Sequence, residues 1–129
     1  MLPSPSPREA SPSQQIKGSV LVVEDDPSSL GALSSILRLW GWDVRGVSTI
    51  ADALPLLEKP FGRLILDLML PDGDGVLILR HIRGRSLPTE VIVTTGVSDV
   101  HRLDEVRHLS PRTILTKPID LERLRTCME

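Results

Sequence analysis

Apolar and polar residues follow one another in a repeating order from residue 18 to the end of the chain. Short apolar runs, rich in Val, Ile and Leu, predict strands that are buried on both faces. Between them, segments with apolar residues three and four positions apart predict amphipathic helices. The predicted strands cover residues 19–23, 43–47, 64–66, 91–94 and 113–116. The predicted helices cover residues 30–40, 50–58, 76–84 and 100–109, and a last helix starts at residue 121.

Strand and helix alternate five times, which favours an α/β fold with a doubly wound, five-stranded parallel sheet and helices on both faces. Right-handed crossovers would bring the carboxyl ends of all the strands to one edge of that sheet. Doubly wound proteins bind ligands at this edge. The residues that directly follow the strands are therefore the first candidates for a functional site.

Local signals predict the ends of the first helix. Ser28 and Ser29 are predicted N-caps, because a Ser side chain can accept a hydrogen bond from a free N–H of the first turn. Gly41 is predicted to end the helix, since Gly readily adopts the left-handed conformation found there.

The first 17 residues differ from the rest in composition. Four prolines alternate with serines in this segment. It cannot bury enough apolar surface to offset the entropy lost on ordering, so residues 1–17 are predicted to be a disordered tail. Residues 18–129 are predicted to form one folded domain.

Composition narrows the range of functions. Of the 129 residues, 40% are hydrophobic and 25% are charged, as in an ordinary globular domain. Aromatic residues make up 2% and the net charge is −2, so direct nucleic-acid binding by base stacking or by a basic stripe is not expected. No apolar run approaches the roughly 18–20 residues of a membrane span. The single cysteine, Cys127, cannot form an internal disulfide, and a cytoplasmic protein is expected.

Polar residues follow four of the five predicted strands. Carboxylates from neighbouring strand ends suit a hard cation such as Mg²⁺. A Lys ammonium and a Thr hydroxyl facing them suit a phosphoryl group, because both stabilise its oxygens. Any one of these residues could merely cap a strand, but together they favour phosphoryl chemistry. The candidates are Glu24, Asp25 and Asp26 after the first strand, Asp67 after the third, Thr94, Thr95 and Gly96 at the fourth, and Lys117 and Pro118 after the fifth.

Four motifs in this order resemble those of the receiver domains of bacterial two-component response regulators: VLVVEDDP, LILDLMLPDGDG, VIVTTG and ILTKP. The resemblance covers about residues 18–126. It implies a flavodoxin-like fold with strand order 2-1-3-4-5. It also implies a phosphoacceptor of a signalling system and not an enzyme, apart from catalysis of its own phosphorylation and a slow autodephosphorylation.

The resemblance implies a role for each matching acid. Asp67 would be the phosphoacceptor, which attacks a phosphohistidine on a partner and holds the group as an acyl phosphate. Asp25 would bind Mg²⁺ directly, together with Asp67 and the main-chain carbonyl of Met69. Glu24 would act mostly through a bound water, and Asp26 would have a supporting role at most.

The resemblance also assigns the last two strand ends. Thr95 aligns with the switch hydroxyl, Gly96 with the small residue that leaves room for the phosphoryl group, and Lys117 with the ion pair to its oxygens. The Lys117–Pro118 bond is expected to be cis, as are only about 5–6% of X-Pro bonds in folded proteins. Many receivers carry Tyr or Phe where this chain has Ile114, which calls an aromatic switch into question.

Two flanking side chains bear on the lifetime of an acyl phosphate. Met69 and Val97 stand two residues after Asp67 and Thr95 respectively. Neither can orient a hydrolytic water as a carboxylate or an amide could. Spontaneous dephosphorylation is therefore predicted to be slow.

Partners follow from the same resemblance. A histidine kinase or a histidine phosphotransfer protein is expected to dock beside the first helix, with Leu30, Leu33 and residues 71–75 as candidate contacts. The face formed by residues 100–125 carries the output in this family, and its charges could support a homodimer. Membrane association is not expected.

Three other classes of protein compete with this interpretation. A Mg²⁺-dependent phosphohydrolase with an Asp nucleophile needs a second acid where this chain has Met69. A flavin binder needs a phosphate-binding loop where the carboxylates of residues 24–26 would repel phosphate. The alternative that stays open is a receiver-like interaction module that signals without phosphorylation, for which Ile114 leaves room.

Overall fold

The computed structural model describes residues 18–96 and 100–129, with the side chains of residues 100–102 outside the description. The disordered tail predicted for residues 1–17 and the role predicted for Val97 therefore lie outside the described residues.

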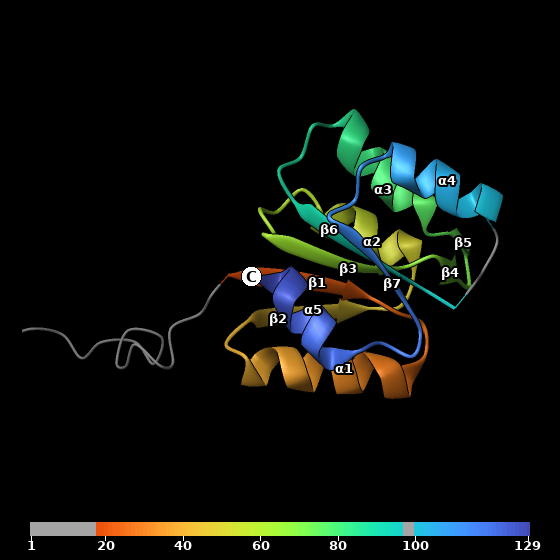
Figure 1. Ribbon diagram of the computed structural model, residues 1–129. Helices are drawn as coiled ribbons and strands as arrows, with labels where there is room; N and C mark the ends of the chain where they lie inside the picture. Colours follow the sequence, from red (N-terminus) through yellow and green to blue (C-terminus); the bar gives the residue numbers. More distant parts are fainter. Residues whose placement is uncertain (1–17, 97–99) are drawn as a thin grey trace, which may run out of the picture.

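Five parallel strands form the central sheet (Figure 1). Their spatial order is β2-β1-β3-β6-β7, with parallel pairing throughout. This confirms the predicted five-stranded sheet, in which the chain order of the strands is 2-1-3-4-5. The strands are β1 Ser19–Val23, β2 Asp43–Val47, β3 Arg63–Asp67, β6 Glu90–Thr95 and β7 Thr113–Thr116.

Helices cover both faces of the sheet, as predicted. Figure 1 shows α1 and α5 on one face and α2, α3 and α4 on the other. The helices are α1 Pro27–Leu39, α2 Ile50–Leu56, α3 Val76–Gly84, α4 Val100–His108 and α5 Leu121–Met128.

The central strand β3 contributes to the cores on both faces. Leu64 and Leu66 are fully buried on the side of α2, α3 and α4, whereas Ile65 is buried on the side of α1 and α5. Successive side chains of a strand point to opposite faces, so a strand covered on both sides must be apolar throughout. With β1 and β6 paired to its two edges, β3 holds its last residue, Asp67, in a fixed position.

A short hairpin follows β3 where the sequence pattern predicts only a turn. Its strands are β4 Met69–Leu70 and β5 Gly73–Asp74, which pair antiparallel. Pro71 and Asp72 form the tip, a placement that suits the fixed φ of Pro and the turn preference of Asp.

The N-cap of α1 is Asp26, so the prediction of Ser28 or Ser29 is wrong. The Asp26 carboxylate accepts hydrogen bonds from the Ser29 N–H (3.0 Å) and the Ser29 hydroxyl (2.7 Å). Pro27 occupies the first helical position, where its fixed φ is favourable and its missing N–H costs nothing. The helix therefore begins before the serines. Gly41 ends the helix as predicted, with φ +98° and its N–H bonded to Arg38.

Candidate functional site

The carboxyl ends of four strands meet at one edge of the sheet and bring most of the candidate residues together. Glu24 directly follows β1, and Asp67 ends β3 beside Thr94 of β6. Lys117 directly follows β7, and its main-chain N–H donates to the Thr95 carbonyl (2.8 Å). The parallel register therefore places these polar residues at the same height in neighbouring strands.

Lys117 lies between two buried carboxylates. Its Nζ is 3.2 Å from each carboxylate oxygen of Glu24 and 3.1 Å from Oδ2 of Asp67. The side chains of Glu24 and Asp67 are 3% and 6% exposed, whereas that of Lys117 is 32% exposed. One ammonium thus offsets the mutual repulsion of two acids that are almost out of water.

The electrostatics of the cluster favour protonation of Glu24. Burial and, after it, the neighbouring Asp67 carboxylate raise the pKa of Glu24, and Lys117 offsets only part of this, which leaves the pKa of Glu24 at about 7. For Lys117, burial lowers the pKa, but its hydrogen bonds to Asp67 and Glu24 outweigh that effect and leave a net increase. The site therefore holds more negative charge than its single lysine balances.

Three carboxylates form a candidate cation site. One carboxylate oxygen from each of Glu24, Asp25 and Asp67 lies within 4.8 Å of the others, and Asp25 is exposed. Oxygen donors of this kind suit Mg²⁺, and a divalent cation would relieve the excess charge described above. Among the residues that the structure describes, no other group of three His, Cys, Asp or Glu side chains comes together in this way.

Hydrogen bonds and a close backbone contact hold the segment directly after Asp67 in place. The Met69 N–H donates to Oδ1 of Asp67 (3.1 Å), so the two oxygens of the carboxylate have different partners. Gly75 donates its N–H to the Leu68 carbonyl (2.8 Å). A Cβ at Gly75 would collide with the carbonyl oxygen of Asp67 and lie 3.0 Å from Cα of Leu68, so only glycine fits. Sequence reasoning missed this role of Gly75, although the Asp-Gly-Asp-Gly run was a signal for it.

The remaining predicted site residues lie where the topology requires. Thr94 and Thr95 are both 1% exposed at the end of β6, and Gly96 follows them at the surface. The Lys117–Pro118 peptide bond is cis, which confirms that prediction. The switching role of Thr95 stays a prediction.

Ile114 occupies the place of the expected aromatic residue. It is partly buried against the core on the α4 side. It borders a surface hollow of about 360 Å³ between α4 and β7. An aliphatic side chain thus leaves this hollow open, where a larger ring would occupy more of it.

The described histidines lie away from the acidic cluster. His81 lies 3.7 Å from Glu58, and Nδ1 of His108 lies 2.7 Å from the Asp104 carbonyl oxygen. They offer no zinc site. In the part of the chain that the structure describes, no helix has the length and apolar character to cross a membrane.

A parallel five-stranded α/β sheet with two buried acids and one lysine at its carboxyl edge defines a class of signalling domain. The sequence matches the family described as response regulator receiver domain over residues 20–129, and the chain belongs to that family. The family belongs to two-component signalling and is not in itself a family of catalytic enzymes.

Individual relatives agree with this assignment. The transcriptional regulatory protein ZraR of Salmonella typhimurium is 31% identical over 111 residues, which are 85% of this chain and 25% of that protein. FixJ of Bradyrhizobium diazoefficiens is 29% identical over 116 residues, which are 88% of this chain and 56% of that protein. The chain therefore spans about a quarter to about half of these two relatives.

Solved structures show the same fold. The receiver domain of a putative LuxO repressor protein from Vibrio parahaemolyticus has 32% identity and a TM-score of 0.78, covering 88% of each chain. A response regulator receiver protein from Pseudomonas putida has 32% identity and a TM-score of 0.80, covering 86% of this chain and 94% of that one.

Proposed function

We propose that this chain is the phosphoacceptor of a two-component system and that Asp67 receives the phosphoryl group from a histidine kinase or a histidine phosphotransfer protein in a Mg²⁺-dependent reaction. The observation that supports this most strongly is the 3.1 Å contact between the Lys117 ammonium and Oδ2 of the buried Asp67. A carboxylate needed only for folding would not be expected in an almost water-free site beside a second acid.

The reaction is a displacement at phosphorus. A lone pair of an Asp67 carboxylate oxygen attacks the phosphorus of phosphohistidine and forms an O–P bond. The P–N bond breaks, and the imidazole of the donor leaves with its electron pair. Lys117 is already in place to neutralise the phosphoryl oxygens, so little reorganisation is needed as charge moves.

Glu24, Asp25 and Asp67, with the main-chain carbonyl of Met69, would hold Mg²⁺. When bound, the ion supplies positive charge to the phosphoryl oxygens. Hydrogen bonding by the Met69 N–H keeps the Asp67 carboxylate oriented towards the edge of the sheet. The Thr95 hydroxyl is the donor that would bind the transferred group once it is on Asp67.

A hollow next to Lys117 is the proposed docking place of the phosphodonor. It measures about 370 Å³, lies between α1 and the β7–α5 connection, and is mainly apolar. Of the two predicted contact residues of α1, Leu33 lines this hollow, whereas Leu30 lines a different hollow beside β2. Leu121, half exposed on the far wall, adds apolar surface. An amphipathic helix of a phosphodonor would bury this surface and bring its histidine to the Lys117 end.

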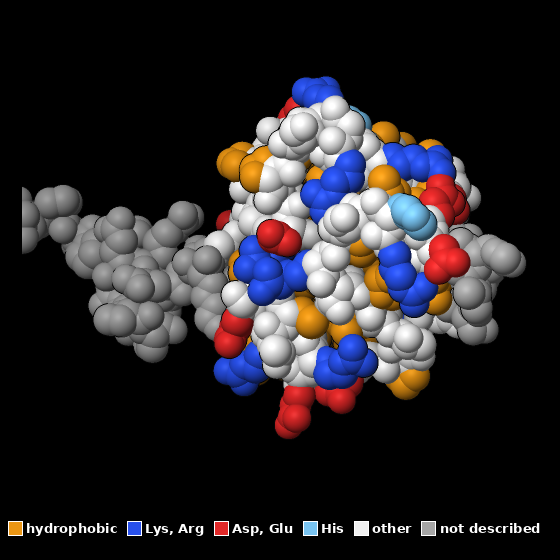
Figure 2. All heavy atoms as spheres, turned by 45° about the horizontal axis from the view of Figure 1, so that its top comes forward, with side chains coloured by type: hydrophobic (Ala, Val, Ile, Leu, Met, Phe, Trp, Pro, Cys, Tyr) orange, Lys and Arg blue, Asp and Glu red, His pale blue; other side chains and the backbone are white. Residues whose placement is uncertain are grey.

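Output through a homodimer of the α4, β7 and α5 face stays part of the proposal. On the neighbouring α3–α4 surface, acidic and basic side chains lie close together (Figure 2), and four of them form two pairs within the chain. Arg80 pairs with Glu105, and Arg107 pairs with Asp104 at 3.2 Å. These exposed pairs contribute little to stability, so they could exchange partners across an interface at small cost.

Treatment with acetyl phosphate and MgCl₂, followed by intact mass measurement, tests the function. The wild type should gain one phosphoryl group, and the gain should disappear in Asp67→Ala or when EDTA replaces MgCl₂. No gain in the wild type would contradict the proposal and favour the receiver-like interaction module.

A further inference from the structure

The hairpin that follows Asp67 is attached at its tip to the beginning of α2. Oδ1 of Asp72 accepts a hydrogen bond from the Ile50 N–H (2.9 Å), and Oδ2 accepts one from the Ala51 N–H (3.0 Å). These backbone bonds lower the pKa of Asp72, so the carboxylate is ionised at neutral pH. One exposed side chain thus joins two segments that are 22 residues apart in the sequence.

Apolar packing and backbone geometry support the same attachment. Gly73 has φ +146°, and a Cβ there would lie 3.2 Å from Cδ1 of Ile50. The hairpin therefore lies directly against the first residue of α2. Its tip is held by the two Asp72 hydrogen bonds and by this close contact.

The base of the hairpin is attached to the phosphoacceptor. Gly75 binds Leu68 at the closing end, and the Met69 N–H binds Oδ1 of Asp67. Only a two-residue turn separates β4 from β5, so a displacement of the tip would be transmitted to Met69. The path from α2 to the Asp67 carboxylate consists of hydrogen bonds and one short hairpin.

We propose that Asp72 is a positioning residue for phosphoryl transfer, which holds the β4–β5 hairpin against α2 so that the Met69 main chain stays in place beside Asp67. This inference rests on the proposed function. It assigns to Asp72 no contact with the phosphoryl group or the metal. Its effect passes through Met69 alone.

The chain supplies a matched control at the same end of α2. Thr49 is the N-cap of α2, and its hydroxyl oxygen accepts from the Asp52 N–H (3.0 Å). Thr49→Ala and Asp72→Ala each remove side-chain hydrogen bonds from the first turn of α2. Only Asp72→Ala also releases the hairpin. Asp72 is exposed, so its truncation leaves no cavity and the protein should still fold.

Amide hydrogen exchange, followed by NMR without metal or phosphodonor, tests the attachment. In Asp72→Ala the Met69 amide should exchange about tenfold faster than in the wild type, because the hairpin opens locally more often. Thr49→Ala should leave this rate unchanged while lowering the urea midpoint. Asp72→Asn, which keeps one acceptor oxygen, should fall between Asp72→Ala and the wild type.

Phosphorylation by acetyl phosphate over a series of MgCl₂ concentrations tests the consequence. Asp72→Ala should need about threefold to tenfold more MgCl₂ for half-maximal rate, less than the 10–100-fold typical of residues that bond to a metal ligand directly. Thr49→Ala should match the wild type. Equal Met69 exchange in the two alanine variants, or an equal MgCl₂ requirement, would overturn the role of Asp72.

The two proposals fail in different ways. If Asp67 of the wild type takes up no phosphoryl group, the proposed function fails and the role of Asp72 in transfer fails with it. If the wild type is phosphorylated normally but the Asp72 and Thr49 variants behave alike, only the positioning role fails.

Discussion

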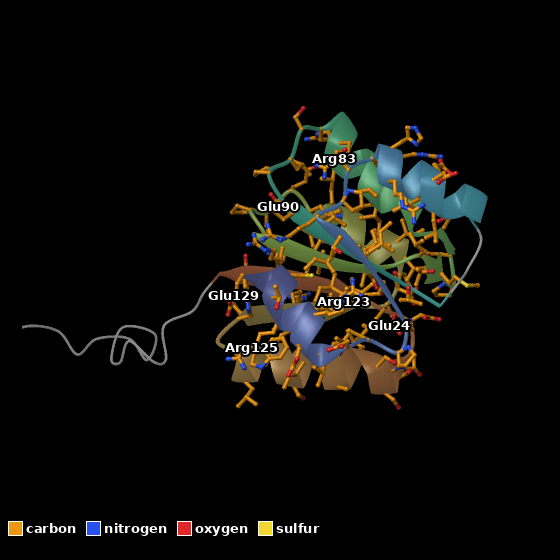
Figure 3. The ribbon with its side chains drawn as sticks, viewed as in Figure 1. Glu24, Arg83, Glu90, Arg123, Arg125 and Glu129 are labelled. Atoms are coloured by element: carbon orange, nitrogen blue, oxygen red, sulfur yellow. The ribbon has the colours of Figure 1, made fainter. Side chains whose placement is uncertain are left out.

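Buried polar groups at the two ends of the central sheet have opposite kinds of partner: neutral hydrogen bonds at the amino end and ion pairs at the carboxyl end. At the amino end, the buried Thr89 hydroxyl donates to the Phe61 carbonyl (2.8 Å), and the Glu90 N–H donates to Gly62 (3.1 Å). At the carboxyl end, Glu24 and Asp67 are buried as a pair of acids with one lysine. Figure 3 shows the labelled Glu24 and Glu90 at these opposite ends.

This difference distinguishes polar groups that stabilise the fold from polar groups that fit a functional role. A neutral hydrogen bond contributes about 0.5–1.5 kcal/mol, so the amino end stabilises the fold directly. A buried ion pair recovers little of the cost of removing its charges from water. The buried charges at the carboxyl end fit the proposed function, in which a cation and a phosphoryl group bind beside them.

The largest expected effect comes from removing the shared ammonium. Lys117→Ala should slow phosphorylation of Asp67 by about 100-fold or more, because a preorganised positive charge is lost from the phosphoryl oxygens. The rate of acyl phosphate formation with acetyl phosphate measures this. Lys59→Ala, an exposed lysine near the amino end, is the matched control and should react at the wild-type rate. Equal rates in the two variants would contradict this role of Lys117.

Glu24 should make stability depend on pH. Its pKa is about 7 in the folded protein and 4.5 as a free group. The raised pKa means that its contribution to stability is complete below pH 4.5 and is lost as pH rises through 7. The free energy of unfolding without metal should therefore fall by about 1–3 kcal/mol from this group between pH 4.5 and 8.

Urea unfolding at pH 5 and pH 8 in EDTA measures this dependence. Glu24→Gln should show a clearly smaller fall in stability with pH than the wild type does. Glu90→Gln, at the opposite end of the sheet, should keep the wild-type dependence. A wild-type slope retained in Glu24→Gln would rule out this assignment.

The amino end should affect stability alone. Thr89→Val keeps the shape of the side chain but leaves the Phe61 carbonyl without its buried donor, which should cost about 1–2 kcal/mol. Urea unfolding measures the loss, and the phosphorylation rate should be unchanged. A parallel loss of phosphorylation would show that the two ends are not independent.

The smallest effect concerns the lifetime of the acyl phosphate. Met69 is 59% exposed beside Asp67 and cannot orient a hydrolytic water. Met69→Asn should shorten the half-life of the phosphorylated protein severalfold, whereas Leu77→Asn on the exposed side of α3 should not. Decay of the phosphorylated form by intact mass compares them, and an unchanged half-life in Met69→Asn would count against the prediction.

The sequence predicted those features that depend on local pattern and on strand topology. The apolar residues 64–66 predicted a strand buried on both faces, and the common edge of parallel strands brought Asp67 and Lys117 together. The predicted N-cap of α1 was wrong because Pro27 is favourable at the first helical position, which makes Asp26 the N-cap. The Asp72 contact with α2 could not be predicted, since no local signal links segments 22 residues apart. The hydrogen bonds of Lys117 to Glu24 could not be predicted either, because strand topology brings both residues to one edge of the sheet but does not decide which groups touch.

The position of the phosphoryl group on the chain can be determined by chemical reduction and mass spectrometry. After treatment with acetyl phosphate and MgCl₂, borohydride reduction converts an aspartyl phosphate to homoserine, which peptide mass spectrometry can place. Homoserine is expected at position 67 in the wild type, and no homoserine is expected when EDTA replaces MgCl₂. Reduction at another acid such as Asp25, or no reduced peptide at all, would contradict this expectation.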